Sequence, residues 1–398
     1  MTSNYKWYIV ILTFLMGVFV LWTPLMAIAV LFPVIAKDLH LSVAQAGLIW
    51  GIAPAAGVLV SIIGGLLADR VGIRFVIGGF AVLGGIFGAL RGISTDFVSL
   101  LIMMFVFGIC FWVIQVNLPK VVRIWFPPQQ LGLANGIVAS SGIVGGVVGA
   151  GISATVVLSA VGSWQNVLFL YGAIGAFIGI LWLVTAKEPS QAGPPLRVSL
   201  GEAFSKMVRT KGVWLCGITM LGLMAGYQGL TGYLPMYLGS MGWSPASAGG
   251  ALSVLIGVGV VTVILVPALS DKIGLRKAFV IAPALVFAIA VCLLAAFKTT
   301  TPLWSMMILT GLAWGPIIAV LFCSLTEQEE VGPVFAGTAL GIVGTLGCAG
   351  GFIGPVVGNA LAATNPAFPF LVFGALAGIF VITYFFARET GAKVTAVK

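Results

Sequence analysis

The segment GGLLADRVGIR, residues 64–74, places one acid and two bases in a short run: Asp69, Arg70 and Arg74. Only 7% of the 398 residues are charged, so such a run stands out in this chain. A second segment, VPALSDKIGLR at residues 266–276, repeats its core with Asp271 and Arg276, and the two acids are 202 positions apart (271 minus 69). The repetition suggests two related halves.

A second pair of segments supports an internal repeat. LGLANGIVASSGIVGG at 131–146 aligns with AGTALGIVGTLGCAGG at 336–351. The matched glycines are 205 positions apart (337 minus 132). Two different motifs therefore recur in the same order at nearly the same spacing. Chance similarity between glycine-rich segments could explain one such match, but hardly both in the same order.

The composition indicates the fold class. Hydrophobic residues make up 60% of the chain and the mean hydropathy is +1.18, more than one water-soluble core could bury. Segments of about 20 apolar residues cross a bilayer as helices. Such runs lie near 8–36, 43–67, 75–93, 98–122, 132–159, 165–185, 213–238, 246–269, 277–297, 303–325, 333–361 and 367–387. We expect an all-α membrane protein with twelve transmembrane helices in two pseudo-symmetric six-helix bundles.

One long polar connection, from Lys187 to Lys211, separates the sixth run from the seventh. It predicts an N-terminal six-helix bundle at 1–190, a cytoplasmic linker at 191–211 and a C-terminal six-helix bundle at 212–398. Parallel repeats of six spans are a transporter architecture with a site between the halves.

The basic residues predict the orientation. With a cytoplasmic amino terminus, 16 of the 19 Lys and Arg residues lie on the inner side, and the exceptions are Lys37, Arg91 and Lys298. The net charge of +9 then reflects topology and contact with the lipid bilayer, so no nucleic-acid partner is expected. We expect a multi-pass protein of the cytoplasmic (inner) membrane, a monomer with both termini cytoplasmic. Arg91 lies near the outer end of the third span and is not assigned to the site.

The loop motif resembles that of the major facilitator superfamily, written here as Gly65, Leu67, Asp69, Arg70, Gly72 and Arg74. The resemblance extends over nearly the whole chain. NLPKVVRIWFPPQQLGLANGI at 117–137 further resembles the branch of cyanate permeases and nitrate/nitrite porters. Two features depart from the pattern: Ile73 stands where the loop motif often has a base, and neither span 2 nor span 8 contains the arginine with which nitrate porters bind their anion.

The resemblance implies a conformational latch at the inner side, which opens when the protein opens inward. Its residues would be Gly65, Asp69, Arg70, Gly72, Arg74, Asp271 and Arg276. Gly65 and Gly72 would allow close approach and a tight turn. Alternatively, the bases serve topology alone, which leaves Asp69 and the second copy unexplained. The glycines of spans 5 and 11 are expected to let opposite halves approach, with static packing as the alternative.

Polar and aromatic side chains deep in spans 1, 4, 7 and 10 are the candidate substrate site, because such groups are costly in hydrocarbon. These four spans line the cavity in the family. The candidates are Trp22, Trp112, Gln115, Asn117, Lys120, Tyr227, Gln228, Tyr233 and Trp314. The amides would donate hydrogen bonds and the rings would form apolar walls. The aromatic residues could instead serve packing, and Lys120 could extend to the headgroups or attract anions.

The ten acids and His40 all map to loops or span ends, which disfavours a cationic substrate. No catalytic triad, phosphate-binding loop or metal-ligand cluster is recognisable, so we expect no enzyme, catalytic residue, metal or cofactor. The sequence favours a secondary active or facilitative transporter of a small anion or small polar solute. The alternative is an efflux transporter for small neutral or drug-like compounds.

Overall fold

The structure is a computed structural model that describes residues 3–127, 130–187 and 200–391. In this part of the chain, twelve helical segments are long and apolar enough to cross a membrane, as predicted. They are Tyr5–Asp38, Val43–Ser61, Ile73–Ile93, Phe97–Trp125, Leu131–Val161, Trp164–Thr185, Lys211–Ser240, Pro245–Ile273, Lys277–Leu294, Thr300–Thr326, Val334–Ala363 and Phe368–Phe386. Part of the predicted linker, 191–199, lies outside the described residues.

The chain divides into two compact units by its internal contacts. The first unit comprises Met1–Pro194 and Leu234–Ser253, and the second comprises Pro195–Tyr233 and Val254–Lys398. The domain limits expected from the sequence, at 190 and 212, stay a prediction.

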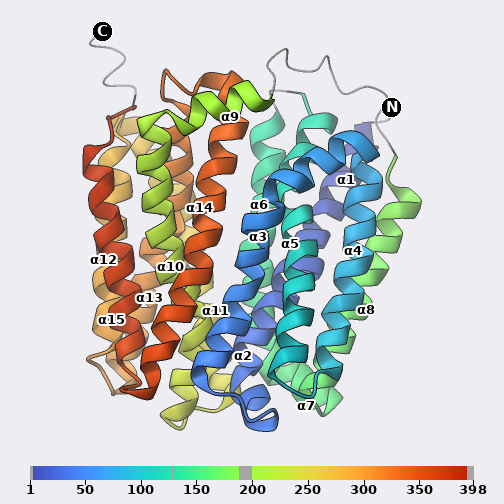
Figure 1. Cartoon of the computed structure of the whole chain (residues 1–398), viewed down its shortest axis with the longest axis vertical. Helices are drawn as coiled ribbons and strands as arrows, with labels where there is room; N and C mark the ends of the chain where they lie inside the picture. Colours follow the sequence, from blue (N-terminus) through green and yellow to red (C-terminus); the bar gives the residue numbers. More distant parts are fainter. Residues whose placement is uncertain (1–2, 128–129, 188–199, 392–398) are drawn as a thin grey trace. The chain divides into compact units, whose positions relative to one another are not determined.

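The first unit contains the first six spans (Figure 1). Its elements are α1 (Ser3–Met16), the π-helix η1 (Gly17–Trp22), α2 (Thr23–Asp38), α3 (Val43–Val71), α4 (Ile73–Leu90), η2 (Arg91–Ile93), α5 (Phe97–Trp125), α6 (Leu131–Ile152), the π-helix η4 (Ser153–Val157), α7 (Leu158–Val161) and α8 (Trp164–Thr185). α1, η1 and α2 together form the first span.

The second unit contains the short helix α9 and most of the last six spans. Its elements are α9 (Leu200–Val208), α10 (Lys211–Ser240), α11 (Pro245–Ile273), α12 (Lys277–Leu294), α13 (Thr300–Thr326), α14 (Gly332–Ala360), η5 (Leu361–Ala363), α15 (Phe368–Val381) and η6 (Ile382–Phe386). The end of α10 and the start of α11 belong to the first unit.

Local sequence signals set several helix ends. Ser42 caps α3 in a capping box with Gln45, and Asp96 caps α5 in the same way with Ser99. Hydrogen bonds from the Ser99 backbone and side chain lower the pKa of the Asp96 carboxyl. The turn between α3 and α4 requires Gly72, whose φ is 100°, because side chains rarely adopt this conformation.

Gly145 of α6 and Gly350 of α14 pack against helices of their own unit. A Cβ added at Gly145 would lie 2.9 Å from the Val18 carbonyl oxygen of η1. In the second unit, a Cβ at Gly350 would overlap the Leu221 carbonyl of α10. The expectation that these faces serve contact between opposite halves is thus wrong for Gly145 and Gly350, because close backbone packing inside each unit occupies them.

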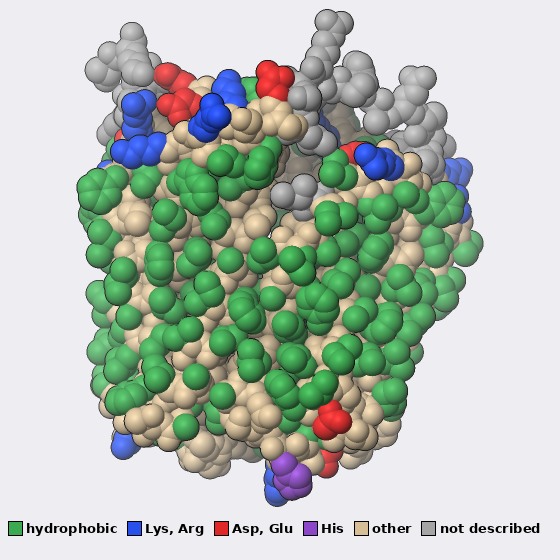
Figure 2. All heavy atoms as spheres, viewed as in Figure 1, with side chains coloured by type: hydrophobic (Ala, Val, Ile, Leu, Met, Phe, Trp, Pro, Cys, Tyr) green, Lys and Arg blue, Asp and Glu red, His purple; other side chains and the backbone are tan. Residues whose placement is uncertain are grey.

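Charged and apolar side chains separate along the helices. Figure 2 shows hydrophobic side chains over the flanks of the helices on the face viewed, with Lys, Arg, Asp, Glu and His side chains near the helix ends. Large apolar side chains such as Phe177 and Ile264 are 65% and 67% exposed. Because exposed apolar patches of this extent suit hydrocarbon, the surface fits a bilayer.

Candidate functional site

Trp22 lies in an aromatic cluster of the first unit. It is half-buried at the end of η1, and short π-helical stretches are frequent at functional sites. Its ring contacts Phe111 of α5 edge-on, with centroids 5.2 Å apart and planes at 82°. Phe111 in turn lies 5.4 Å from the ring of Trp112. Spans 1 and 4 thus bring both predicted tryptophans together through a residue that the sequence analysis did not select.

Trp112 is held in one orientation by α3. Its indole Nε1 donates a hydrogen bond to the Ala53 carbonyl at 3.0 Å, and a Cβ added at Gly57 would lie 2.8 Å from its ring. One turn further along α5, Gln115 is half-buried, and its buried Oε1 accepts no hydrogen bond from a described residue. The Oε1 of Gln115 can therefore accept a hydrogen bond from a donor group of a solute.

Asn117 and Lys120 are engaged elsewhere. Asn117 is fully buried, and its amide nitrogen donates to the carbonyls of Gly64 at 3.0 Å and Val113 at 2.8 Å, which ties α5 to α3. Lys120 forms an ion pair with Asp69 and lies 3.4 Å from the Gly65 carbonyl oxygen. The structure therefore groups Lys120 with the loop motif.

The second unit carries a comparable aromatic cluster. Tyr227 of α10 stacks on Trp314 of α13, with ring centroids 4.0 Å apart and planes at 4°. Phe287 of α12 lies 5.3 Å from Trp314. Gln228, the neighbour of Tyr227, is half-buried. Tyr233 lies apart from this stack: it is 3% exposed, and its hydroxyl donates to the Pro366 carbonyl at 2.7 Å.

The two clusters occupy repeat-related positions. Trp112 and Trp314 are 202 positions apart (314 minus 112), the spacing of the loop motif. Trp22 and Tyr227 are 205 positions apart (227 minus 22), the spacing of the glycine motif. Each half therefore contributes one aromatic pair from equivalent spans, a signal that the sequence alone contains.

The first copy of the loop motif makes contacts within the first unit. The Arg74 guanidinium donates to the Leu183 carbonyl at the end of α8, with Nε at 2.9 Å. Trp182 Nε1 donates to the Arg74 carbonyl at 3.1 Å. Arg70 is exposed, and an added Cβ at Gly65 meets no atom within 4 Å, so close approach at Gly65 is not observed.

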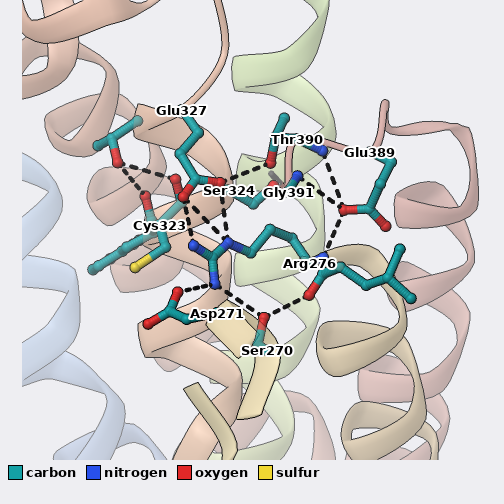
Figure 3. A network of polar contacts seen from close by, with 12 residues as sticks. Ser270, Asp271, Arg276, Cys323, Ser324, Glu327, Glu389, Thr390 and Gly391 are labelled. Atoms are coloured by element: carbon teal, nitrogen blue, oxygen red, sulfur yellow. Dashed lines mark hydrogen bonds and ion pairs between the residues drawn. The ribbon is translucent and has the colours of Figure 1, made fainter. Parts of the chain in front are cut away.

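The second copy forms a denser network, shown in Figure 3. Arg276 contacts Glu327 through Nε at 3.0 Å and Nη2 at 2.6 Å. Its Nη1 lies 2.5 Å from an Asp271 oxygen and 3.0 Å from Ser270 Oγ. The hydrogen bonds to Glu327, then those to Asp271, raise the pKa of Arg276 above its ordinary value. The guanidinium therefore stays charged.

The segment after η6 closes this network (Figure 3). Glu389 accepts hydrogen bonds from the backbone amides of Arg276 at 2.6 Å and Lys277 at 3.1 Å, at the start of α12. Thr390 Oγ1 donates to Glu327 at 3.2 Å. A carboxylate at a helix amino terminus is favourable. Glu327 and Glu389 lie at span ends in the sequence, which alone does not pair them with Arg276.

Acidic residues in the described part of the chain lie at helix ends, in connections or on α9, and Glu188 lies outside that part. The described residues contain no group of three or more His, Cys, Asp or Glu side chains placed to hold a metal ion.

The sequence profile of the Major Facilitator Superfamily matches residues 14–355. The chain belongs to the major facilitator superfamily. Its members are transporters. The profile match confirms the predicted resemblance, and the twelve apolar helices confirm the predicted fold class. A solved bacterial homologue of the human lysosomal transporter Spinster, in an inward-facing and unoccupied conformation, has the same fold, with a TM-score of 0.82 and 18% identity over 97% of both chains.

Characterised relatives match more locally. The hexuronate transporter of Bacillus subtilis is 29% identical over 48% of this chain and 44% of its own length. The nitrite extrusion protein of the same organism is 26% identical over 81% of this chain and 79% of its own length. The chain spans about half the length, or less, of the first relatives that it matches. The second relative agrees with the predicted resemblance to nitrate/nitrite porters.

Proposed function

We propose that this protein is a secondary active or facilitative transporter that carries a small anion across the cytoplasmic membrane by alternating access. Both termini would lie on the cytoplasmic side. The observation that carries the proposal is the charge distribution. The described acids lie at helix ends, in connections or on α9, so no carboxylate in the middle of a described span would repel an anion. The two relatives named above transport a hexuronate and nitrite, both anions, which supports the same class.

We expect each aromatic cluster to contact the substrate within its own unit. The Trp22–Phe111–Trp112 and Tyr227–Trp314 groups present ring faces and edges, and the positive ring edges suit an anionic group. Gln115 and Gln228 lie beside them on α5 and α10 and carry amide groups that can hold the polar part of a solute.

Uptake into liposomes tests the substrate class. We expect purified protein to carry at least one of nitrite and D-glucuronate in a saturable way, and to leave uncharged glucose and hydrophobic dyes outside. Export of dyes without transport of either anion would instead favour the efflux alternative, which the apolar rings would suit.

A pair of variants tests the aromatic site. We expect Trp314→Ala to raise KM several-fold, because it removes a ring that is proposed to contact the substrate. The lost stack with Tyr227, about 0.5–1.5 kcal/mol for such ring pairs, should also lower stability. The matched control is Tyr233→Phe, which removes the hydroxyl that binds the Pro366 carbonyl. This control should lower stability slightly and leave KM unchanged.

Spin labels test alternating access. Labels at Arg123 and Thr326, near the inner ends of α5 and α13 in a variant without the native cysteines, should show two distance populations whose ratio changes with substrate. One distance that stays the same with and without a transported anion would contradict the rocking mechanism.

A further inference from the structure

Arg91 is a fully buried arginine at the start of η2, near the end of the third span. Its Nε donates to the Gly88 carbonyl at 3.1 Å, and Nη1 lies 3.5 Å from the Met104 sulfur. Its guanidinium carbon lies 4.0 Å from the centroid of the Phe107 ring. Nη2 is buried and donates to no described group.

No ion pair of the described residues includes Arg91. An arginine is effectively never deprotonated in a protein, so this side chain keeps its charge in an apolar environment. Intramembrane charges are costly and mark functional positions unless a partner neutralises them. The partners of Arg91 are a backbone carbonyl, a thioether and a ring, which bind a cation weakly. A residue that only braced the helices would therefore not need a charge.

A continuous aromatic path leads from Arg91 to the candidate site. The Phe107 ring lies 6.3 Å from that of Phe111, one turn further along α5. Phe111 contacts both Trp22 and Trp112. The unpaired cation is thus separated from the predicted site by apolar rings, which screen its field far less than water does.

We propose that Arg91 is a specificity-determining residue whose unpaired charge favours anions at the Trp22–Trp112 cluster. Arg91 acts through space and through Phe107, without touching the substrate, and the inference rests on the proposed anion transport. The steps from Arg91 to Phe107, Phe111 and Trp22 are 4.0, 6.3 and 5.2 Å. Over such a separation, with an effective dielectric constant of about 20, a unit charge changes the affinity for a monovalent anion by up to about tenfold.

A side-chain exchange tests this role. Arg91→Met removes the charge, and Arg91→Met combined with Met104→Arg returns it from the contacting position on α5, with the same two side chains. We expect Arg91→Met to raise the KM for nitrite or D-glucuronate about tenfold with little change in kcat. The double variant should restore KM to within about threefold of the wild type, although it does not restore the bond to the Gly88 carbonyl.

The measurements separate charge from structure. Thermal midpoints in detergent report folding, and Arg91→Gln supplies a second neutral variant if Arg91→Met gives little protein. A lower kcat or thermal midpoint with unchanged KM would overturn the inference, as would a folded exchange variant that keeps the raised KM. If the wild type carries neither anion, the proposed function fails. If it carries one and Arg91→Met has the same KM, only the role of Arg91 fails.

Discussion

Arg276 holds Glu327 through two parallel hydrogen bonds, Nε to Oε2 at 3.0 Å and Nη2 to Oε1 at 2.6 Å. The planar guanidinium matches the carboxylate, and such bidentate pairs are among the strongest polar contacts in proteins. The first copy of the loop motif uses Lys120 and Asp69 instead, whose side chains are 33% and 59% exposed. Those of Arg276 and Glu327 are 11% and 34% exposed. The ion pair of the second copy is therefore more buried than that of the first, and we expect it to hold its loop more strongly.

Glu327→Gln should destabilise the second unit. The substitution leaves the mostly buried Arg276 with Asp271 as its remaining acid partner, so the free energy of unfolding should fall by about 1–2 kcal/mol. Unfolding by SDS in mixed micelles measures the change. The matched control is Glu330→Gln, which neutralises an exposed acid three residues away and should have no effect. Equal stability of the two variants would contradict a structural role for the Arg276–Glu327 pair.

Asp69→Asn should affect transport more than stability. Its partner Lys120 is part of an exposed pair, and such pairs contribute about 0–1 kcal/mol. We expect both Asp69→Asn and Lys120→Gln to fold normally, to slow transport several-fold and to favour inward-open forms, because Asp69 belongs to the latch that the loop motif predicts. The double variant should be no slower than either single variant. Wild-type rates for Asp69→Asn would show that the motif serves topology alone.

The fold could be predicted because its signals are local or repeated. Apolar runs of sufficient length specify the spans, and Gly72 has the positive φ that the turn between the second and third spans needs. The contacts of the glycine faces could not be predicted. Small residues only permit close approach, and which helix approaches Gly145 depends on the packing of the whole unit.

The candidate site could be predicted only in part. The spacing of Trp112 and Trp314 repeats that of the loop motif, and their side chains lie in aromatic clusters. The use of Asn117 as a tether between helices was not predictable, because a buried amide can bind a solute or a backbone carbonyl equally well. Arg91 and Phe107 come together only through the packing of η2 on α5, so the sequence alone does not pair them.

Gly350→Ala should test the close approach of α14 to α10. The added methyl group would overlap the Leu221 carbonyl, and the helices must separate to accept it. Strain of this kind costs about 1–3 kcal/mol, which should appear as a lower thermal midpoint in detergent. Gly337→Ala is the matched control on the same helix, since its Cβ would meet no atom within 4 Å. A variant Gly350→Ala as stable as Gly337→Ala would show that the helices move apart freely.

A pH gradient should not drive accumulation of a permanently ionised substrate. A protein that carries protons itself needs a titrating group in the membrane pathway. The described acids lie at helix ends, in connections or on α9, and His40 lies in the connection between α2 and α3.

The protein would then facilitate diffusion, exchange anions, or depend on a weakly acidic substrate that takes up the proton. In liposomes with the membrane potential clamped, a sulfonate analogue of the transported anion should therefore only equilibrate, whereas a weak acid should be concentrated by its own protonation. Concentration of the sulfonate would contradict this prediction, because it would mean that a group of the protein itself carries the proton.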